Sequence, residues 1–362
     1  MDRCPPMQTR GVKYIGSKLS LLEHIMASVD ARLGPVAGRM IDVCSGTTRV
    51  AQAFRGRGWA VQSSDLSWAT EAYAHAFLMR TAESGSRVGG LLAELRGVAG
   101  SVGWITTNYC DVSGVEGGTV RMWRPENGRM ADGIRDKIAA WEASGHINRH
   151  EAMILVACLI FALDKVDNSV GVQQAYLKDW ATRTADALML VDLPFTEGPV
   201  ATHYVGNCLE IAYEEADFAY IDPPYSAHSY STYYHIWDSI TRWDKPAVSL
   251  KTNRRIDRVS GAEEFDGAMV SSWNSKRTAL QSFLAVCESL SVRHVLISYN
   301  NESILPIKVL CDSLKERFGA DAVSVEEIQY KRNIMSQIGN AVLYKSEFKT
   351  ENMEYLIWVR KA

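Results

Sequence analysis

Residues 40–48 read Met-Ile-Asp-Val-Cys-Ser-Gly-Thr-Thr, and this stretch predicts the fold of the chain. The apolar run Met40 to Val43 is typical of a short buried strand. A helical stretch follows from Arg49 to about residue 57, Gly58 ends it, and Trp59 to Asp65 predicts a second strand. A strand, a loop, a helix and a strand within so short a stretch are the beginning of a doubly wound α/β sheet.

The apolar run Phe218 to Ile221 predicts another buried strand, and Asp222-Pro223-Pro224-Tyr225 ends it. Two consecutive prolines cannot continue the hydrogen bonds of a sheet, so the chain must turn there. A carboxylate, two carbonyls and an aromatic ring therefore gather at the carboxyl end of a strand, where open α/β sheets bind ligands. Such a group can accept hydrogen bonds from an exocyclic amino group and stack on the base that carries it. A plain Pro-Pro turn with a packed tyrosine explains the same four residues equally well.

The remaining pattern predicts helices on both sides of a mainly helical middle region. Between residues 125 and 195 the sequence shows few strand signals, which favours an inserted helical subdomain. Helices are expected at 19–33, 68–98, 133–141, 151–164, 176–188, 233–242, 273–290 and 302–318. Strands are expected at 219–222, 294–299, 323–330 and 355–360, after the sheet pattern resumes near residue 202, and loops at 99–120 and 244–272.

The composition is that of an ordinary globular protein, with 47% hydrophobic and 22% charged residues. The longest apolar stretch, Ile154 to Leu163, is too short to cross a bilayer, and the polar N-terminus lacks the apolar core of a secretory signal. The seven scattered cysteines predict neither a disulfide framework nor a zinc site and fit a reducing cytoplasm. With a net charge of −3, any surface for nucleic acid must be local. Residues 121–137 and 251–258 carry enough basic side chains to form such a surface, although a run of charges is more often simply a face exposed to water.

The loop from Asp42 to Thr47 has the features of a site for a small anion. Gly46 lets the backbone approach a ligand closely, and the following helix begins with unpaired N–H groups. The loop has neither the three glycines of a dinucleotide site nor a Walker lysine, so a single carboxylate fits it better. Asp65, at the end of the next strand, suits the two hydroxyls of a ribose, although a helix N-cap explains it equally well. A small anionic group and a ribose without further phosphates describe S-adenosylmethionine.

In this order, the motifs resemble those of the Dam-like family of N6-adenine-specific DNA methyltransferases. Lys13-Tyr14-Ile15-Gly16-Ser17-Lys18 comes first, and the loop from Asp42 to Thr47, an intervening recognition region and Asp222 to Tyr225 follow. Other stretches that resemble family members are Arg124 to Arg129, Asp164 to Asn168, Ala175 to Lys178, Ser229 to His235, Leu296 to Glu302 and Glu354 to Ile357. Each motif alone is of limited specificity, whereas their ordered co-occurrence over nearly the whole chain is specific.

The resemblance implies a fold and a division of the chain. We expect a Rossmann-like S-adenosylmethionine-dependent methyltransferase sheet flanked by helices, with an inserted mainly helical subdomain. Residues 1–100 would form the cofactor-binding half of the catalytic domain, 101–200 the helical target-recognition region, and 201–362 the half with Asp-Pro-Pro-Tyr.

The resemblance also implies roles for single residues at the cofactor. Lys18 would hold the methionine carboxylate, with Tyr14 nearby, and Asp65 would hold the ribose. The methionine end would lie among Asp42, Ser45, Gly46, Thr47 and Asp222. Asn207 stands where the family usually has an aspartate that accepts from the adenine of the cofactor. Its amide would form a weaker bond, and a plain turn residue explains Asn207 as well.

The implied function is methyl transfer to the N6 amino group of an adenine that is flipped out of double-stranded DNA. Asp222 and the Pro223 carbonyl would accept from the amino group, and Tyr225, after Pro224, would stack on the base. DNA contacts are expected from Tyr230, Lys251, Arg254, Arg255, Arg124 and Lys178, and no metal is expected. The enzyme would be cytoplasmic, without a membrane partner, and either part of a restriction–modification system with a cognate endonuclease or a stand-alone methylase.

Three alternatives remain open from the sequence. Some RNA adenine methyltransferases share Asp-Pro-Pro-Tyr, whereas cytosine N4 enzymes usually have Ser in place of the first Asp. A binding module that holds S-adenosylmethionine or nucleic acid without turnover is the third alternative, and the intact motif at Asp222 argues against it.

Overall fold

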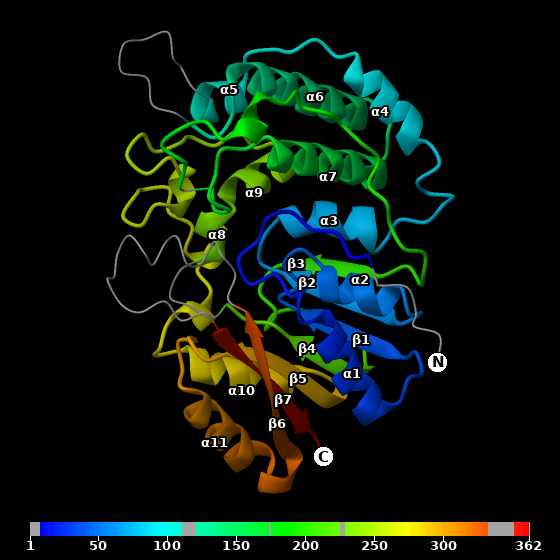
Figure 1. The fold of residues 1–362 in the computed structure, drawn as a ribbon, viewed down its shortest axis with the longest axis vertical. Coiled ribbons are helices and arrows are strands. Elements are labelled where there is room, and N and C mark those ends of the chain that lie inside the picture. The colour runs from blue at the N-terminus through cyan, green and yellow to red at the C-terminus, as the bar shows by residue number, and fades with distance from the viewer. Residues whose placement is uncertain (1–7, 111–120, 174, 225–228, 332–350, 362) are drawn as a thin grey trace.

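A single sheet organises the computed structural model, which describes residues 8–110, 121–173, 175–224, 229–331 and 351–361 (Figure 1). In the described part of the chain, seven strands pair in the order β3-β2-β1-β4-β5-β7-β6. The strands are β1 (Arg39–Val43), β2 (Ala60–Asp65), β3 (Thr202–Val205), β4 (Ala216–Ile221), β5 (Val292–Asn300), β6 (Val323–Lys331) and β7 (Glu351–Arg360).

Strands β3, β2, β1, β4 and β5 run parallel, and β7 lies antiparallel between β5 and β6. The strand order reverses between β1 and β4, which makes a topological switch point at the middle of the sheet. The predicted Rossmann-like, doubly wound sheet with flanking helices is therefore confirmed.

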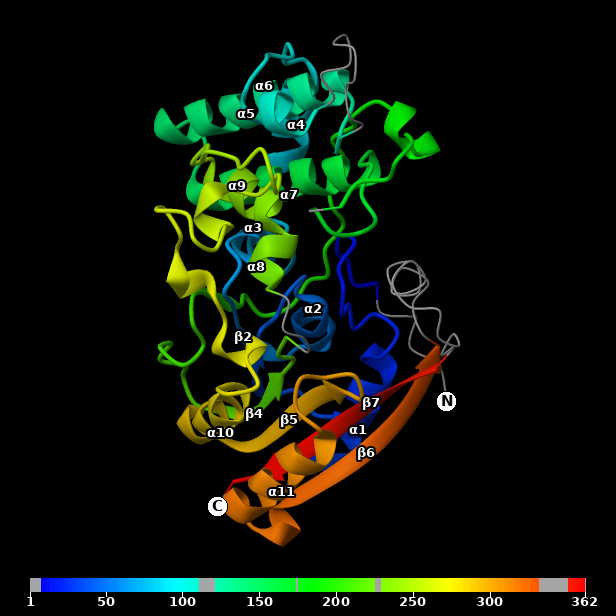
Figure 2. The same ribbon diagram turned by 90° about the vertical axis from the view of Figure 1, so that its left-hand side faces the viewer.

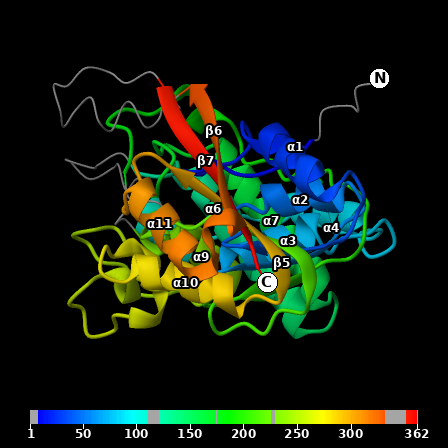
Figure 3. The same ribbon diagram turned by 90° about the horizontal axis from the view of Figure 1, so that it is seen from below.

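Helices cover both faces of the sheet because side chains alternate along its buried strands. Met40 and Phe218 pack against α1 (Leu22–Leu33) and α2 (Arg49–Arg55) on one face. Ile41 and Ala219 pack against α10 (Ala279–Ser289) and α11 (Ile307–Phe318) on the other. Figure 3 shows the two helix pairs on opposite sides of the sheet. This alternation follows from the two-residue period of a strand.

The other helices form a layer beyond the end of the sheet, in which α3 and α8 lie nearest to the strands (Figure 2). One continuous apolar core joins these helices, including both α3 from the first part of the chain and α9 from the last. They are α3 (Ala69–Phe77), α4 (Val88–Arg96), α5 (Trp104–Tyr109), α6 (Pro125–Ala143), α7 (Arg149–Lys165), α8 (Tyr230–Tyr233) and α9 (His235–Arg242). Within the described residues, no helix is both long and apolar enough to cross a membrane.

Two local predictions were wrong, and in both cases distant side chains explain the difference. Residues 176–188 are not helical apart from a 3₁₀ turn at Thr182–Ala185. The Asn168 side chain accepts from the N–H of Ala181 and donates to the Leu177 carbonyl, which replaces helical hydrogen bonds. Within the predicted loop 99–120, α5 forms because the Asp132 carboxylate accepts from the backbone N–H groups of Gly103, Ile105 and Thr106.

Arg55, at the end of α2, connects the helix that follows the loop from Asp42 to Thr47 to two distant loops. Its guanidinium is buried and donates to five backbone carbonyls, those of Phe77, Arg80, Thr196, Gly198 and Pro199. The bonds to Phe77 and Arg80 are buried, and buried carbonyls need such partners because water cannot replace them.

We expect Arg55→Met to destabilise the protein by about 3 kcal/mol, because it leaves the carbonyls of Phe77 and Arg80, whose bonds to Arg55 are buried, without this donor. Arg57→Met is the matched control, since Arg57 forms a half-exposed ion pair with Asp30 and its loss should cost less than about 1 kcal/mol. The midpoint of urea unfolding measures both changes. Equal midpoints for the two variants would contradict the assigned role of Arg55.

Candidate active site

Three aspartates lie at one edge of the sheet, at the carboxyl ends of neighbouring parallel strands. Asp42 is next to last in β1, Asp65 is last in β2, and Asp222 directly follows β4. Because β2, β1 and β4 are adjacent and parallel, the three side chains come together around one cavity. This cavity lies at the switch point of the strand order, where open α/β sheets bind ligands.

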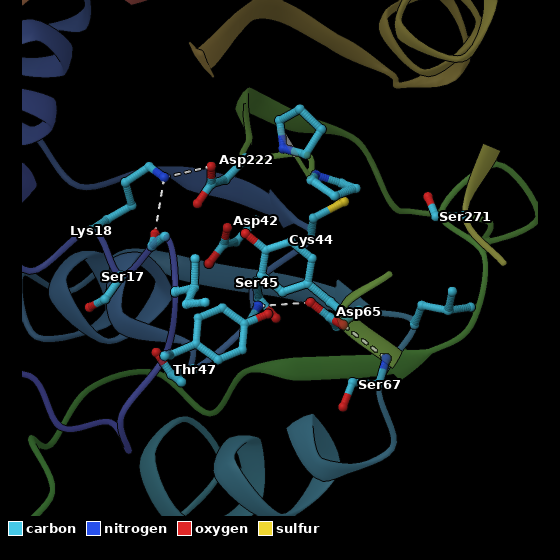
Figure 4. A pocket seen from close by; sticks show the side chains of 18 of the residues that line it. Ser17, Lys18, Asp42, Cys44, Ser45, Thr47, Asp65, Ser67, Asp222 and Ser271 are labelled. Atoms are coloured by element: carbon cyan, nitrogen blue, oxygen red, sulfur yellow. Dashed lines mark hydrogen bonds and ion pairs between the residues drawn. The ribbon is translucent and has the colours of Figure 1, made fainter. Parts of the chain in front are cut away.

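The cavity opens to solvent, and the empty space within it, open solvent included, is about 890 Å³. Figure 4 shows many of its side chains, with Ser271 opposite Lys18. Its wall is built from segments that are distant in sequence, at 14–18, 42–50, 65–67, 220–224, 229–231 and 269–274.

Lys18 brings a buried positive charge to these carboxylates. Its Nζ lies 2.7 Å from Oδ1 of Asp222 and 3.7 Å from Oε1 of Glu354, and it donates to the Gly16 carbonyl (Figure 4). Burial alone would lower the pKa of Lys18, but the charges of Asp222 and Glu354 outweigh it and raise the pKa above its usual value. The ammonium therefore stays charged in a place that excludes most water.

Asp42 and Ser45 present unused polar atoms inside the cavity. Oδ2 of Asp42 accepts from the N–H of Ala51 at 3.1 Å. Among the described residues, neither Oδ1 of Asp42 nor Oγ of Ser45 has a hydrogen-bond partner, although both are buried. Burial, with the charge of Asp222 added, raises the pKa of Asp42 well above its usual value. Buried polar atoms without partners are expensive, so these two atoms suit a polar ligand such as the methionine end of S-adenosylmethionine.

The loop after β1 is held in a conformation that few residues adopt. Its φ angles are 61° at Cys44, 50° at Gly46 and 60° at Thr48, all in the left-handed region. The N–H of Gly46 donates to Oδ2 of Asp65 at 2.8 Å, which ties the loop to the end of β2. A Cβ atom at residue 46 would lie 3.2 Å from the Tyr14 ring, so the ring rests directly on this backbone. Strained backbone of this kind is common at ligand sites.

Asp65 has both carboxylate oxygens on backbone donors. Oδ2 accepts from Gly46 and Oδ1 accepts from the N–H of Ser67 at 2.9 Å. Burial nevertheless raises the pKa of Asp65 to about 6. Each oxygen keeps a second lone pair, so the carboxylate can still accept from ligand hydroxyls.

Tyrosines form the wall between the cavity and the helical layer. The Tyr14 ring stacks on the Tyr234 ring with ring centroids 4.5 Å apart, and the centroid of the Tyr230 ring lies 5.5 Å from that of Tyr14. The Tyr234 hydroxyl accepts from the N–H of Ile15 at 2.7 Å. These contacts fix the N-terminal segment that carries Lys18.

Asn207 does not line the cavity. Its exposed side chain donates to Glu210 and accepts from the N–H of Leu209, as a turn residue does. The next residue, Cys208, hydrogen-bonds Cys44, and this bond together with burial raises the pKa of the Cys44 thiol. The loop thus borders the site, while the Asn207 amide is turned into the loop.

The structure places Thr47, Pro223 and Pro224 in the cavity wall together with Asp222, whereas Tyr225 lies outside the described residues, so its stacking role remains a prediction. Sequence reasoning missed Met269, Ser271 and Asn274, which also line the cavity. They end a long polar loop, and no local pattern in it indicates a site.

The predicted DNA contacts are scattered. Arg255 is buried, where it binds the carboxylates of Asp244 and Asp257, so it is not available to a phosphate. Lys178 and Lys251 are exposed. Tyr230 belongs to the cavity wall, Arg254 is half-buried, and Arg124 lies 4.8 Å from the centre of the Trp180 ring.

Comparison with known proteins identifies a family. A family model described as D12 class N6 adenine-specific DNA methyltransferase matches residues 14–308, more than half of the chain. The chain is 28% identical over 337 residues to modification methylase LlaI of Lactococcus lactis subsp. lactis, covering 88% of this chain and 51% of that protein. It is 26% identical to type II methyltransferase M.FokI of Planomicrobium okeanokoites, and the match covers 97% of this chain and 53% of that protein. The chain thus spans about half the length of these two relatives.

One further relative matches over nearly its whole length, whereas a solved structure matches only distantly. Type II methyltransferase M.NlaIII of Neisseria lactamica is 27% identical, with coverage of 88% of this chain and 92% of that protein. Among solved structures, the chain aligns with magnesium protoporphyrin IX methyltransferase from Synechocystis PCC 6803 at 8% identity and a TM-score of 0.33, covering 94% and 79%. The latter likeness is too distant to support any argument.

We expect Gly46→Ala to weaken binding of S-adenosylmethionine about tenfold, which is 1.4 kcal/mol, because the methyl group displaces the Tyr14 ring. Gly145→Ala is the matched control: Gly145 also has a positive φ, of 73°, but among the described residues no atom lies within 4 Å of an added Cβ. Isothermal titration calorimetry measures the two affinities. Comparable losses in both variants would show that backbone strain alone matters.

Proposed function

The chain belongs to the D12 class of N6 adenine-specific DNA methyltransferases, and we propose that it transfers a methyl group from S-adenosylmethionine to the N6 amino group of an adenine in double-stranded DNA. The observation that carries this proposal is the position of Asp222. It lies at the end of β4, at the switch point of the sheet, and lines the same cavity as Asp42, Ser45 and Asp65. An acceptor for an amine and groups suited to a cofactor thus share one site.

Asp222 and Pro223 would act on the amino group of the base. This nitrogen is a poor nucleophile because its lone pair is delocalised into the ring. The Asp222 carboxylate and the Pro223 carbonyl would each accept one of its N–H bonds and free the lone pair for attack. Two oxygens aimed at the nitrogen also stabilise the positive charge that develops there. Asp222 need not remove a proton in the transfer step, because the proton becomes acidic only afterwards.

Residues on the other side of the cavity fit the cofactor. The unpartnered atoms of Asp42 and Ser45 would bind the methionine end, with Thr47 and the Gly46 backbone beside it, and Asp65 would accept from the ribose. The cofactor supplies a methyl group on a positively charged sulfur, which is already activated for transfer. Positioning of the amine against that methyl is the main contribution of the protein.

The target base must leave the helix to reach this cavity, which costs a few kcal/mol. The wall beyond Asp222 would receive it, with hydroxyls from Ser229, Ser231 and Ser271 and an apolar contact from Met269. We propose that residues 101–200 take part in target recognition and that exposed Lys178 and Lys251 bind phosphates. The names of the relatives, modification methylases and type II methyltransferases, support a place beside a cognate restriction endonuclease.

Incubation with labelled S-adenosylmethionine and unmethylated genomic DNA should transfer label and yield N6-methyladenine in the digested DNA. Asp222→Ala should lower the transfer rate at least about a thousandfold, because the amine loses its charged acceptor, whereas the dissociation constant for the cofactor should change little. Mass spectrometry of nucleosides and calorimetry measure the two quantities.

Other outcomes of this experiment point to other functions. Label found as 4-methylcytosine, or as N6-methyladenosine in RNA alone, would replace the proposed substrate. Cofactor binding without any transfer would indicate a binding module. Near-normal turnover of Asp222→Ala would remove Asp222 from the mechanism.

The affinity for S-adenosylmethionine should fall as the pH drops through about 6. The raised pKa of Asp65, about 6, means that its carboxylate takes up a proton in this range and loses acceptors for the ribose hydroxyls. Between pH 7.5 and pH 5 the expected loss is about tenfold. Asp65→Asn should bind more weakly at pH 7.5 and show a flatter profile; an unchanged profile in this variant would assign the titration to another group.

A further inference from the structure

Glu354 is a buried carboxylate that has no assigned role in the proposed methyl transfer. It lies in β7, opposite Asn300 of β5 and Ile328 of β6, and only 1% of its surface is exposed. An ionised carboxylate at such a place needs compensation, because its transfer from water is expensive. Ser298 of β5 donates a hydrogen bond to Oε1 of Glu354, and Lys18 approaches the same oxygen at 3.7 Å.

The ammonium of Lys18 therefore lies between carboxylates from two different strands. It contacts Asp222 after β4 at 2.7 Å, which is hydrogen-bond distance, and Glu354 of β7 at a longer, mainly Coulombic distance. Lys18 itself precedes α1 and belongs to no strand. Its long, flexible side chain would adopt many conformations without charges on both sides.

We propose that Glu354 is a positioning residue that holds the Lys18 ammonium against Asp222 and thereby orients the Asp222 carboxylate toward the incoming amino group. This proposal rests on the proposed methyl transfer. One positive and two negative charges leave this cluster with one net negative charge. The negative charge favours the positive charge that develops on the attacking nitrogen, while Lys18 keeps the two carboxylates from repelling each other.

The charges around Lys18 also determine the pH up to which its ammonium stays protonated. The groups that face it are Asp222, Glu354, Asp42 of β1 and Tyr330 of β6. Because Glu354 and Asp222 together raise the pKa of Lys18 against the effect of burial, removal of the Glu354 charge must lower this pKa. A change in the Lys18 pKa without any change in the rate or its pH profile would leave Glu354 with a structural role only.

The central variant is Glu354→Gln, which keeps the shape of the side chain and its bond to Ser298 but removes the charge. We expect the single-turnover rate with saturating cofactor and DNA to fall about tenfold because the carboxylate of Asp222 is less well oriented. The alkaline limb of the pH–rate profile should move to lower pH by about one pH unit. Glu354→Asp, which keeps the charge, should leave the alkaline limb in place and restore part of the rate.

The matched control is Glu326→Gln on the neighbouring strand β6. Glu326 is exposed and accepts from Ser28, away from Lys18. This variant should keep both the wild-type rate and the wild-type alkaline limb. Thermal unfolding of all variants shows whether any loss of rate comes from loss of fold. If Glu354→Gln unfolds, the rates and alkaline limbs of Glu354→Asp and Ser298→Ala are compared with those of the wild type instead.

A second measurement is independent of turnover. In protein with ¹³C-labelled lysine and no cofactor, NMR titration reports the pKa of Lys18, with Lys18→Arg to assign its signal. The pKa should be lower in Glu354→Gln than in the wild type and unchanged in Glu326→Gln. An unchanged Lys18 pKa, or equal rates and equal alkaline limbs in folded Glu354→Gln and wild type, overturns the proposal. Absence of methyl transfer by the wild type would instead refute the proposed function, and the titration would still decide whether Glu354 controls Lys18.

Discussion

The parallel pairing of β2, β1 and β4 forces three carboxylates to one edge of the sheet, and the site depends on how their mutual repulsion is relieved. Two like charges about 4 Å apart repel by roughly 4 kcal/mol near a protein surface. The surroundings of each aspartate differ: burial raises the pKa of Asp42, Asp65 accepts from backbone N–H groups, and Asp222 pairs with Lys18. Among these three aspartates, Asp222 is the one that lies within hydrogen-bond distance of a buried ammonium while it lines the cavity.

The segment before α1 connects this cavity to the helical layer. Nζ of Lys13 lies 2.6 Å from the Asp167 carboxylate, which also pairs with Arg183, and Tyr14 stacks on Tyr234. Five residues after Lys13, Lys18 reaches Asp222 at the edge of the sheet. The ion pairs of Asp167 and the stacking of Tyr14 thus anchor the segment that places the ammonium beside Asp222.

The fold and the edge aspartates could be predicted because their signals are local. Apolar runs show the buried strands, and the carboxyl ends of parallel strands meet whatever the intervening chain does. Other features depend on partners that are distant in sequence. Asp132 caps α5, Asn168 replaces the helical bonds of residues 177–181, and Asp244 draws Arg255 into the interior. Ser271 reaches the cavity only through the path of a long loop, and no periodicity encodes such a path.

The position of β7 has a consequence for how the protein is made. During synthesis β6 emerges before β7, yet among the described strands β6 pairs with β7 only, and β7 fills the place beside β5. Until residues 351–360 leave the ribosome, β5 presents an unpaired edge, which is a surface prone to wrong association. The same strand delivers Glu354 to Lys18. A nascent chain thus adds β7 to the sheet and Glu354 to the charge cluster around Lys18 at the same stage, after β5 and β6 have emerged.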